Sequence, residues 1–203
     1  MKITIPTRQG SLQIADIFFF PEIQSSKSHS LRERNTGPSS NNEYRHLLRQ
    51  KLSEHLRQIG ETRLDPSLLD LNKLPNQKGW SMRLSHCPQG SAFVALASPN
   101  RQVGLDVEAL DRLSQPIIDR IAKPTEQNTC PVRLHLFSAK EAAWKALNQT
   151  FDVPTLAHFE TLNWTPIEEN WWSFKVQFSD QVLDGQGFST EIGPVCMALF
   201  LQN

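Results

Sequence analysis

Two carboxylates occur at alternate positions in the segment VGLDVE, residues 103–108. Successive side chains of a β-strand point to opposite faces, so Asp106 and Glu108 share one face with Gly104. Their positions are roughly 6–7 Å apart along a strand, close enough for both to bind one hard cation. The alternative is a solvated outer face of the sheet, which needs no ligand.

A second pair of charged residues lies in LFSAKEAAWKAL, where Glu141 precedes Lys145 by four residues. That spacing places both on one helical stripe with Phe137, so their side chains can touch. Two structural alternatives stay open. Ser138 and Glu141 match a capping box, and a Glu followed four residues later by Lys is a common surface ion pair.

A third candidate is LSHCP, just before an apolar run. Ser85 offers a hydroxyl and His86 two ring nitrogens, both suited to holding phosphate oxygens. A Cys-His nucleophile formed by His86 and Cys87 is the rival interpretation. Neighbours on an extended backbone point to opposite faces, which argues against their direct pairing.

The elements that position these residues follow from hydrophobic periodicity. Residues 11–20 are rich in β-formers and precede a long loop over residues 24–42, and an amphipathic helix is expected over residues 42–59. Residues 91–97 and 103–108 read as a hairpin around Pro99 and Asn100. We expect a helix over residues 134–147, an alternating strand over residues 172–178 and an apolar strand over residues 195–201, so the fold class is α+β.

The composition limits which classes of partner are expected. The chain has 203 residues, with Lys+Arg 21 balancing Asp+Glu 21, so no net field draws it to nucleic acid or to an anionic membrane. The first residues lack a basic segment followed by a long apolar stretch, which predicts a cytoplasmic location. Cys87, Cys130 and Cys196 are widely spaced and odd in number, which predicts reduced structural thiols.

The ordered set SHC, VGLDVE and FSAKEAAWKAL resembles the phosphopantetheinyl transferase family, in its longer, monomeric branch typified by the surfactin and enterobactin synthetase enzymes. The resemblance implies transfer of the 4'-phosphopantetheine arm of coenzyme A to a serine of an acyl or peptidyl carrier protein, with magnesium as cofactor. Such enzymes serve fatty acid, siderophore or other secondary metabolite synthesis. The implied fold has two pseudo-symmetric α+β halves, residues 1–101 and 102–203, with coenzyme A between them.

The resemblance also implies roles for single residues. Asp106, Glu108 and Glu141 would bind magnesium, and Glu141 or a metal-bound water would take the proton of the carrier serine. Lys145 would contact the phosphates of coenzyme A. The remaining coenzyme A contacts would be Ser85, His86, Arg45 in YRHLL, the nearby Arg49, and either Lys73 or Lys78.

The chain departs from the family at two places. The Gly-Lys-Pro segment upstream of the SH motif is replaced by LNKLPNQKGW, which contains Lys73 and Lys78, and the glycine-rich continuation after the last motif is replaced by NQTFDVP. Two rival functions are a magnesium-dependent phosphodiesterase or nuclease and a non-catalytic carrier-binding relative. Neutral net charge disfavours a nuclease, and the intact set of acidic residues and lysine disfavours the non-catalytic relative.

Overall fold

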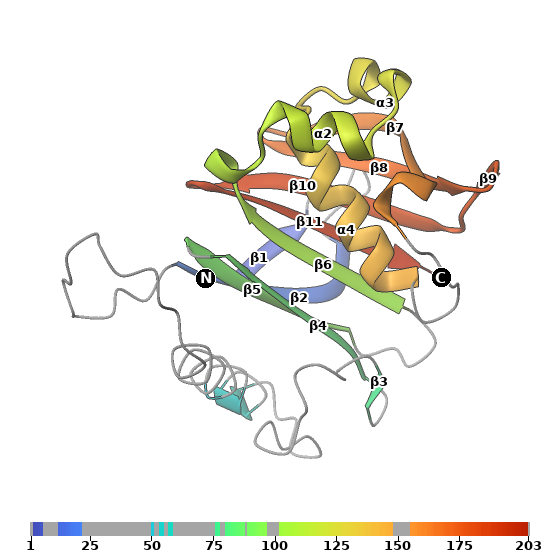
Figure 1. Ribbon diagram of the computed structural model, residues 1–203. Helices are drawn as coiled ribbons and strands as arrows, with labels where there is room; N and C mark the ends of the chain where they lie inside the picture. Colours follow the sequence, from blue (N-terminus) through green and yellow to red (C-terminus); the bar gives the residue numbers. More distant parts are fainter. Residues whose placement is uncertain are drawn as a thin grey trace, which may run out of the picture.

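The computed structural model describes residues 2–5, 12–21, 50, 53–54, 57–58, 76–77, 80–87, 89–96, 102–147 and 155–202. Two antiparallel sheets and a central helix dominate this part of the chain (Figure 1). Mixed helix and antiparallel sheet is the α+β class expected from the sequence, which is confirmed at that level.

The first sheet has the strand order β1-β2-β5-β4-β3. Strand β2 confirms the strand expected over residues 11–20, and β4 and β5 form a hairpin in which Cys87 pairs with Gly90, so the chain reverses within two residues. The strands are β1 (Lys2–Ile5), β2 (Leu12–Pro21), β3 (Asn76–Gln77), β4 (Trp80–Cys87) and β5 (Gly90–Leu96).

The second sheet has the order β6-β11-β10-β8-β7, with β9 paired to β8. Strands β8 and β11 confirm the two strands expected in the tail, whereas β7 and β10 were not predicted. The strands are β6 (Gln102–Ala109), β7 (Phe159–Glu168), β8 (Trp171–Phe178), β9 (Gln181–Val182), β10 (Gly185–Ile192) and β11 (Val195–Gln202).

The predicted hairpin of residues 91–97 with residues 103–108 is wrong. Strand β5 pairs with β2 and β4, while β6 pairs along its whole length with β11 in the other sheet. A turn signal predicts that the chain changes direction, but it does not select the hydrogen-bonding partner. The apolar strand β11 lies about ninety residues later and offers β6 a complete antiparallel ladder.

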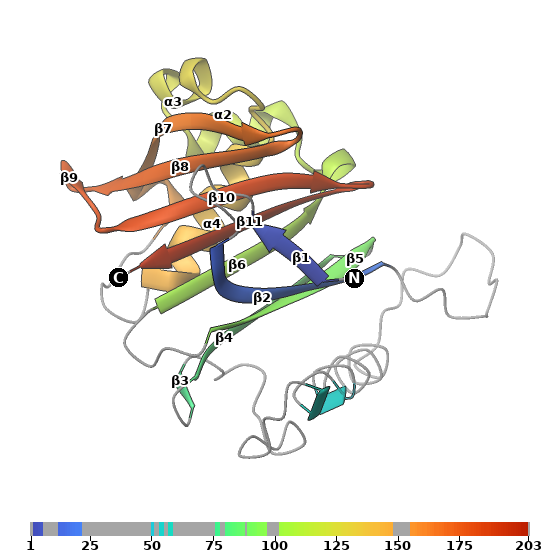
Figure 2. The same cartoon turned by 180° about the vertical axis from the view of Figure 1, so that it is seen from behind.

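Helix α4 (His135–Leu147) confirms the helix expected over residues 134–147 and lies on one face of the second sheet (Figures 1 and 2). Small side chains let it approach closely. A Cβ atom at Gly104 of β6 would collide with the Ala142 carbonyl oxygen, so only glycine fits at this contact. The buried face of α4 includes Ala139, Ala142, Ala143, Ala146 and Leu147, packed with Phe174 and Phe200.

Two short helices connect β6 to α4 and were not predicted. They are α2 (Gln115–Ile121) and α3 (Pro124–Thr129), preceded by the 3-10 turn η2 (Leu110–Arg112). The fully buried Lys140 of α4 donates hydrogen bonds to Glu126 Oε2 at 2.7 Å and to two backbone carbonyls. Because a buried ammonium without acceptors is very unfavourable, these bonds restrict the rotation of α4 about its axis.

Several expectations fall on residues that are described only in part or not at all. Gln50, Ser53, Glu54, Arg57 and Gln58 are helical, which covers a few positions of the helix expected over residues 42–59. The loop expected over residues 24–42 lies outside the described residues. The three cysteines are buried and free, as expected. Among the described helices, none is both long enough and apolar enough to cross a bilayer.

Candidate functional site

Strand β6 presents both acidic side chains to the α4 side of its sheet. Val103, Leu105 and Val107 belong to the hydrophobic cluster on the opposite side, which is the alternation expected for VGLDVE. Asp106 and Glu108 are only 3% and 7% exposed. The alternative of a solvated outer face is therefore wrong, and two buried carboxylates need partners or ligands.

Ser85 brings the first sheet into this site. Its hydroxyl on β4 donates to Asp106 Oδ1 at 3.2 Å and accepts a hydrogen bond from the Val107 amide at 3.1 Å. Strand β6 is at the edge of its sheet, with β11 on its other side, so Ser85 satisfies an amide that the ladder leaves unpaired. The serine therefore joins the two sheets at the carboxylate.

Helix α4 supplies an ammonium and a third carboxylate. Lys145 Nζ lies 2.7 Å from Asp106 Oδ1, 3.0 Å from Glu141 Oε1 and 3.4 Å from Ser85 Oγ. Lys145 also contacts the buried Asp106, so the alternative of a simple surface ion pair between Glu141 and Lys145 is wrong. The capping-box alternative is wrong too, because Ser138 lies inside α4, after its first residue His135.

The charges in this cluster shift one another's pKa. Burial acts to lower the pKa of Lys145, but the negative charges of Asp106 and Glu141 outweigh it and leave that pKa above its ordinary value of 10.5. Burial and the charge of Asp106 raise the pKa of Glu141 more than Lys145 lowers it. Burial also raises the pKa of Glu108, against the opposing effect of Arg112. The ionised forms of Glu108 and Glu141 therefore have too few positive charges and hydrogen bonds around them to offset their burial.

One carboxylate oxygen of the cluster is available to a hard divalent cation. Asp106 Oδ1 accepts hydrogen bonds from Ser85 and Lys145, whereas Asp106 Oδ2 is buried without any hydrogen-bond partner in the described part of the chain. Carboxylate oxygens are the ligands that magnesium prefers, and an ion would satisfy this oxygen. Within the described residues, no three His, Cys, Asp or Glu side chains lie close enough together to hold a metal ion.

The other sequence candidates are placed differently. His86 is exposed and adjacent to Ser85 on β4, so it points to the opposite face, away from the cluster. Cys87 is buried in the core, which separates it from His86 as expected. The four remaining candidates for coenzyme A contacts, Arg45, Arg49, Lys73 and Lys78, lie outside the described residues.

Two arginines at the cluster were missed. Arg112 Nη1 lies 3.2 Å from Glu108 Oε1, and Arg83 Nη2 donates to the Lys145 carbonyl at 3.0 Å. Burial lowers the pKa of Arg83 to about 10. The two-residue spacing of Arg83 from Ser85 places both side chains on one face of a strand but indicates no acceptor. Four-residue spacing brings side chains together in a helix, so it does not predict the contact of Arg112 with Glu108, which lies in a strand.

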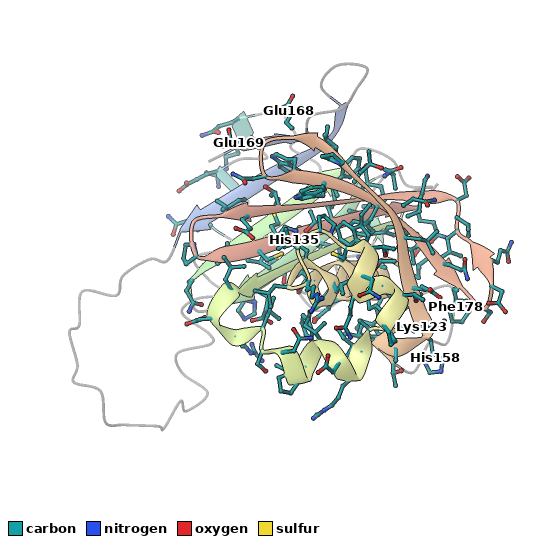
Figure 3. The ribbon with its side chains drawn as sticks, turned by 90° about the horizontal axis from the view of Figure 1, so that it is seen from above. Lys123, His135, His158, Glu168, Glu169 and Phe178 are labelled. Carbon is teal, nitrogen blue, oxygen red and sulfur yellow. The ribbon has the colours of Figure 1, made fainter. Side chains whose placement is uncertain are left out.

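A separate buried polar group fixes the start of α4. Ser189 Oγ and Glu191 Oε1 lie 3.0 Å and 3.3 Å from the two ring nitrogens of His135. Burial lowers the pKa of His135, although Glu191 acts to raise it. Figure 3 shows His135 near the middle of the molecule, whereas Glu168 and His158 lie toward its edges. Ser189 is fully buried, so this group is an anchor and not a nucleophile.

No protein-family model matches the chain, and no curated protein matches it.

Proposed function

We propose that this protein transfers the 4'-phosphopantetheine arm of coenzyme A to a serine of an apo acyl or peptidyl carrier protein. One observation carries the proposal. Ser85, Asp106 and Lys145 come from three separate motifs, and their side chains meet within hydrogen-bonding distance. Residues that act on one substrate must lie close together in the folded protein, whereas chance matches to three motifs have no reason to meet in space.

Asp106, Glu108 and Glu141 would hold magnesium. When bound, magnesium neutralises charge that develops on the pyrophosphate oxygens of coenzyme A. Binding of one ion by all three carboxylates requires the side chains of Glu108 and Glu141 to turn toward Asp106. The unpartnered Asp106 Oδ2 and the raised pKa values of the two glutamates support this assignment, because a cation relieves both.

Lys145 and Glu141 would act on the reacting groups. In the reaction the carrier serine oxygen bonds to the phosphorus that carries pantetheine, and the bond from that phosphorus to adenosine 3',5'-bisphosphate breaks. Lys145, held charged by its two carboxylates, would stabilise the leaving phosphate. Glu141 would accept the serine proton, since a raised pKa makes a carboxylate a better base near neutral pH.

Ser85 and the fold have supporting roles in this proposal. The Ser85 hydroxyl would contact a coenzyme A phosphate, together with the basic residues of the N-terminal part, whereas His86, on the opposite face of β4, would not share that contact. Two pseudo-symmetric halves, residues 1–101 and 102–203, would place coenzyme A between them. Every described strand of the first sheet precedes residue 97 and every strand of the second follows residue 101, which agrees with that division. A monomer in the cytoplasm completes the proposal.

Mass spectrometry of apo carrier proteins tests the function. Several acyl and peptidyl carriers are incubated with the protein, coenzyme A and magnesium, and the expected gain is the mass of one phosphopantetheine on the carrier serine. Omission of magnesium, omission of coenzyme A and a carrier with its serine replaced by alanine are the controls. Folded protein that modifies none of the carriers contradicts the proposal, and hydrolysis of coenzyme A without a carrier would favour the phosphodiesterase instead.

A further inference from the structure

Arg83 and Ser85 lie two residues apart on β4, so both point to the same face of that strand. Each of them contacts Lys145. Ser85 Oγ accepts from the ammonium at 3.4 Å, and Arg83 Nη2 donates to the backbone carbonyl of the same lysine at 3.0 Å. Two residues of the first sheet thus contact Lys145, one at its ammonium and one at its backbone carbonyl.

The main-chain contact is made in the last turn of α4. The helix ends at Leu147, and the last four carbonyls of a helix have no partner within it. A cation at this end is also favoured by the helix dipole. Arg83 therefore satisfies a terminal carbonyl and ties the end of α4 to β4.

The position of this turn decides where the lysine ammonium can reach. Lysine has four rotatable side-chain bonds and a large rotamer entropy, so its ammonium is ordered only where its backbone is fixed and its partners are close. If the last turn is loosened, only the side-chain contacts with Asp106, Glu141 and Ser85 order the ammonium. Burial lowers the pKa of Arg83 only to about 10, so the guanidinium stays charged at neutral pH.

We propose that Arg83 is a positioning residue that orders Lys145 through its backbone carbonyl, for the phosphate contact of the transferase reaction. The role of the contact rests on the proposed function, whereas the ordering of Lys145 does not. Arg83 is not expected to touch coenzyme A itself, since its guanidinium is engaged with the helix end.

The first experiment needs no substrate. Limited acetylation with acetic anhydride, followed by peptide mass spectrometry, measures the reactivity of each lysine amine in wild type, Arg83→Met, Arg83→Lys and Arg120→Met. In Arg83→Met the reactivity of Lys145 should rise at least about threefold, because a less ordered amine is more often open to solvent. Lys123 and Lys140 serve as exposed and buried internal standards. Arg120, exposed on α2, is the matched control and should change nothing.

The second experiment separates positioning from coenzyme A binding. Arg83→Met should lower kcat by about tenfold and leave KM for coenzyme A within about twofold, because an interaction made in the transition state is weakened. Arg83→Lys should recover part of kcat, since an ammonium can also donate to the carbonyl. If Arg83→Met does not fold, Arg83→Lys is measured in its place.

Three results would overturn the inference. Unchanged Lys145 reactivity in both Arg83 variants would show that Arg83 does not order the lysine. A raised KM for coenzyme A at normal kcat would make Arg83 a ligand contact. Unchanged kcat and KM per folded molecule, with a lower Tm, would leave only a structural role. If wild type modifies no carrier, the proposed function fails, and the acetylation result still decides whether Arg83 orders Lys145.

Discussion

Lys145 Nζ lies 2.7 Å from Asp106 Oδ1, although 39 residues separate them along the chain. The carboxylate is buried and the ammonium is largely covered, so the pair is desolvated and strongly coupled. It joins helix α4 to strand β6 at the point where Ser85 of the other sheet also bonds. Each charge in this contact therefore has a role in stability as well as a candidate role in chemistry, and the two can be separated by experiment.

Replacing Asp106 with Asn should abolish detectable transfer and leave the fold intact but less stable. The amide keeps the size of the side chain but cannot bind a hard cation well, and it leaves Glu141 as the one carboxylate in contact with Lys145 in the described cluster. The lost charged hydrogen bonds should lower the free energy of unfolding by about 1–3 kcal/mol, measured by urea denaturation. Asp119→Asn, on the exposed side of α2, is the matched control and should behave as wild type. Normal turnover in Asp106→Asn would remove Asp106 from the site.

Gly104→Ala should damage the site without altering any charged residue. The added methyl would meet the Ala142 carbonyl and the Ala146 amide, so α4 must move away from β6 and carry Glu141 and Lys145 with it. Overpacking of this kind costs about 1–3 kcal/mol, and more where backbone atoms must shift. Both Tm and kcat/KM should fall.

Gly193→Asn is the control for that substitution. Gly193 has φ +57° and nothing lies within 4 Å of its added Cβ, and asparagine tolerates this conformation. Its kcat/KM should equal that of wild type. Equal activity of Gly104→Ala would mean that the closeness of α4 to β6 does not matter for the chemistry.

The raised pKa of Glu108 predicts how stability changes with pH. A carboxyl whose folded pKa lies above its ordinary 4.5 binds its proton more tightly in the folded state. Its contribution is therefore fully present below pH 4.5 and is lost as pH rises through the folded pKa. The free energy of unfolding of wild type minus that of Glu108→Gln should fall across this window, in denaturant titrations at several pH values. A difference that rises with pH would contradict the assigned direction.

The same raised pKa values set the acid limb of the pH profile of kcat/KM for transfer. Glu141 and Glu108 must be ionised to bind a cation or accept a proton, so kcat/KM should decline as pH falls through a value above the ordinary 4.5 of a glutamate. Higher magnesium should move that limb to lower pH, because the cation competes with the proton. A limb that does not respond to magnesium would separate the titrating group from the metal site.

The parts of the site with local signals were predictable from the sequence. Period-two alternation placed Asp106 and Glu108 on one face, and four-residue spacing placed Glu141 beside Lys145, because both periodicities follow from backbone geometry. The burial of Asp106 had no such signal. It depends on β6 pairing with β11 and on α4 covering the strand, which are contacts between distant segments.

Contacts between the two sheets also could not be predicted from the sequence. The predicted pairing of residues 91–97 with residues 103–108 is wrong because proximity along the chain does not determine the strand partner. The sequence predicts Ser85 as a phosphate contact, but its bond to the Val107 amide arises only where β4 meets the edge of β6. Arg83 could not be predicted because its spacing from Ser85 indicates a shared face but no partner, and its acceptor is a backbone carbonyl of a distant helix.

Exchanging the charges of Glu141 and Lys145 tests whether their ion pair is all that matters. An exposed i, i+4 pair contributes about 0.3–0.5 kcal/mol and tolerates reversal with a small loss. In the double variant Glu141→Lys/Lys145→Glu, a glutamate would instead face Asp106. We expect kcat/KM to fall by at least about two orders of magnitude, or about 2.7 kcal/mol of transition-state stabilisation. Circular dichroism should show unchanged helix content, and near-normal turnover would restore the surface-pair interpretation.

Removing the Lys145 ammonium should strengthen metal binding while it abolishes transfer. The ammonium contacts Asp106 and Glu141, two of the carboxylates that magnesium would use, so it competes with the ion for the same negative charge. In Lys145→Met the Kd for Mn²⁺, measured by electron paramagnetic resonance without coenzyme A, should fall by at least about tenfold, which corresponds to about 1.4 kcal/mol. Lys123→Met, which removes an exposed ammonium paired with Glu160, is the matched control and should leave the Kd unchanged. Asp106→Asn should bind Mn²⁺ more weakly than any other variant. An unchanged or higher Kd in Lys145→Met would mean that the ammonium supports the ion and does not compete with it.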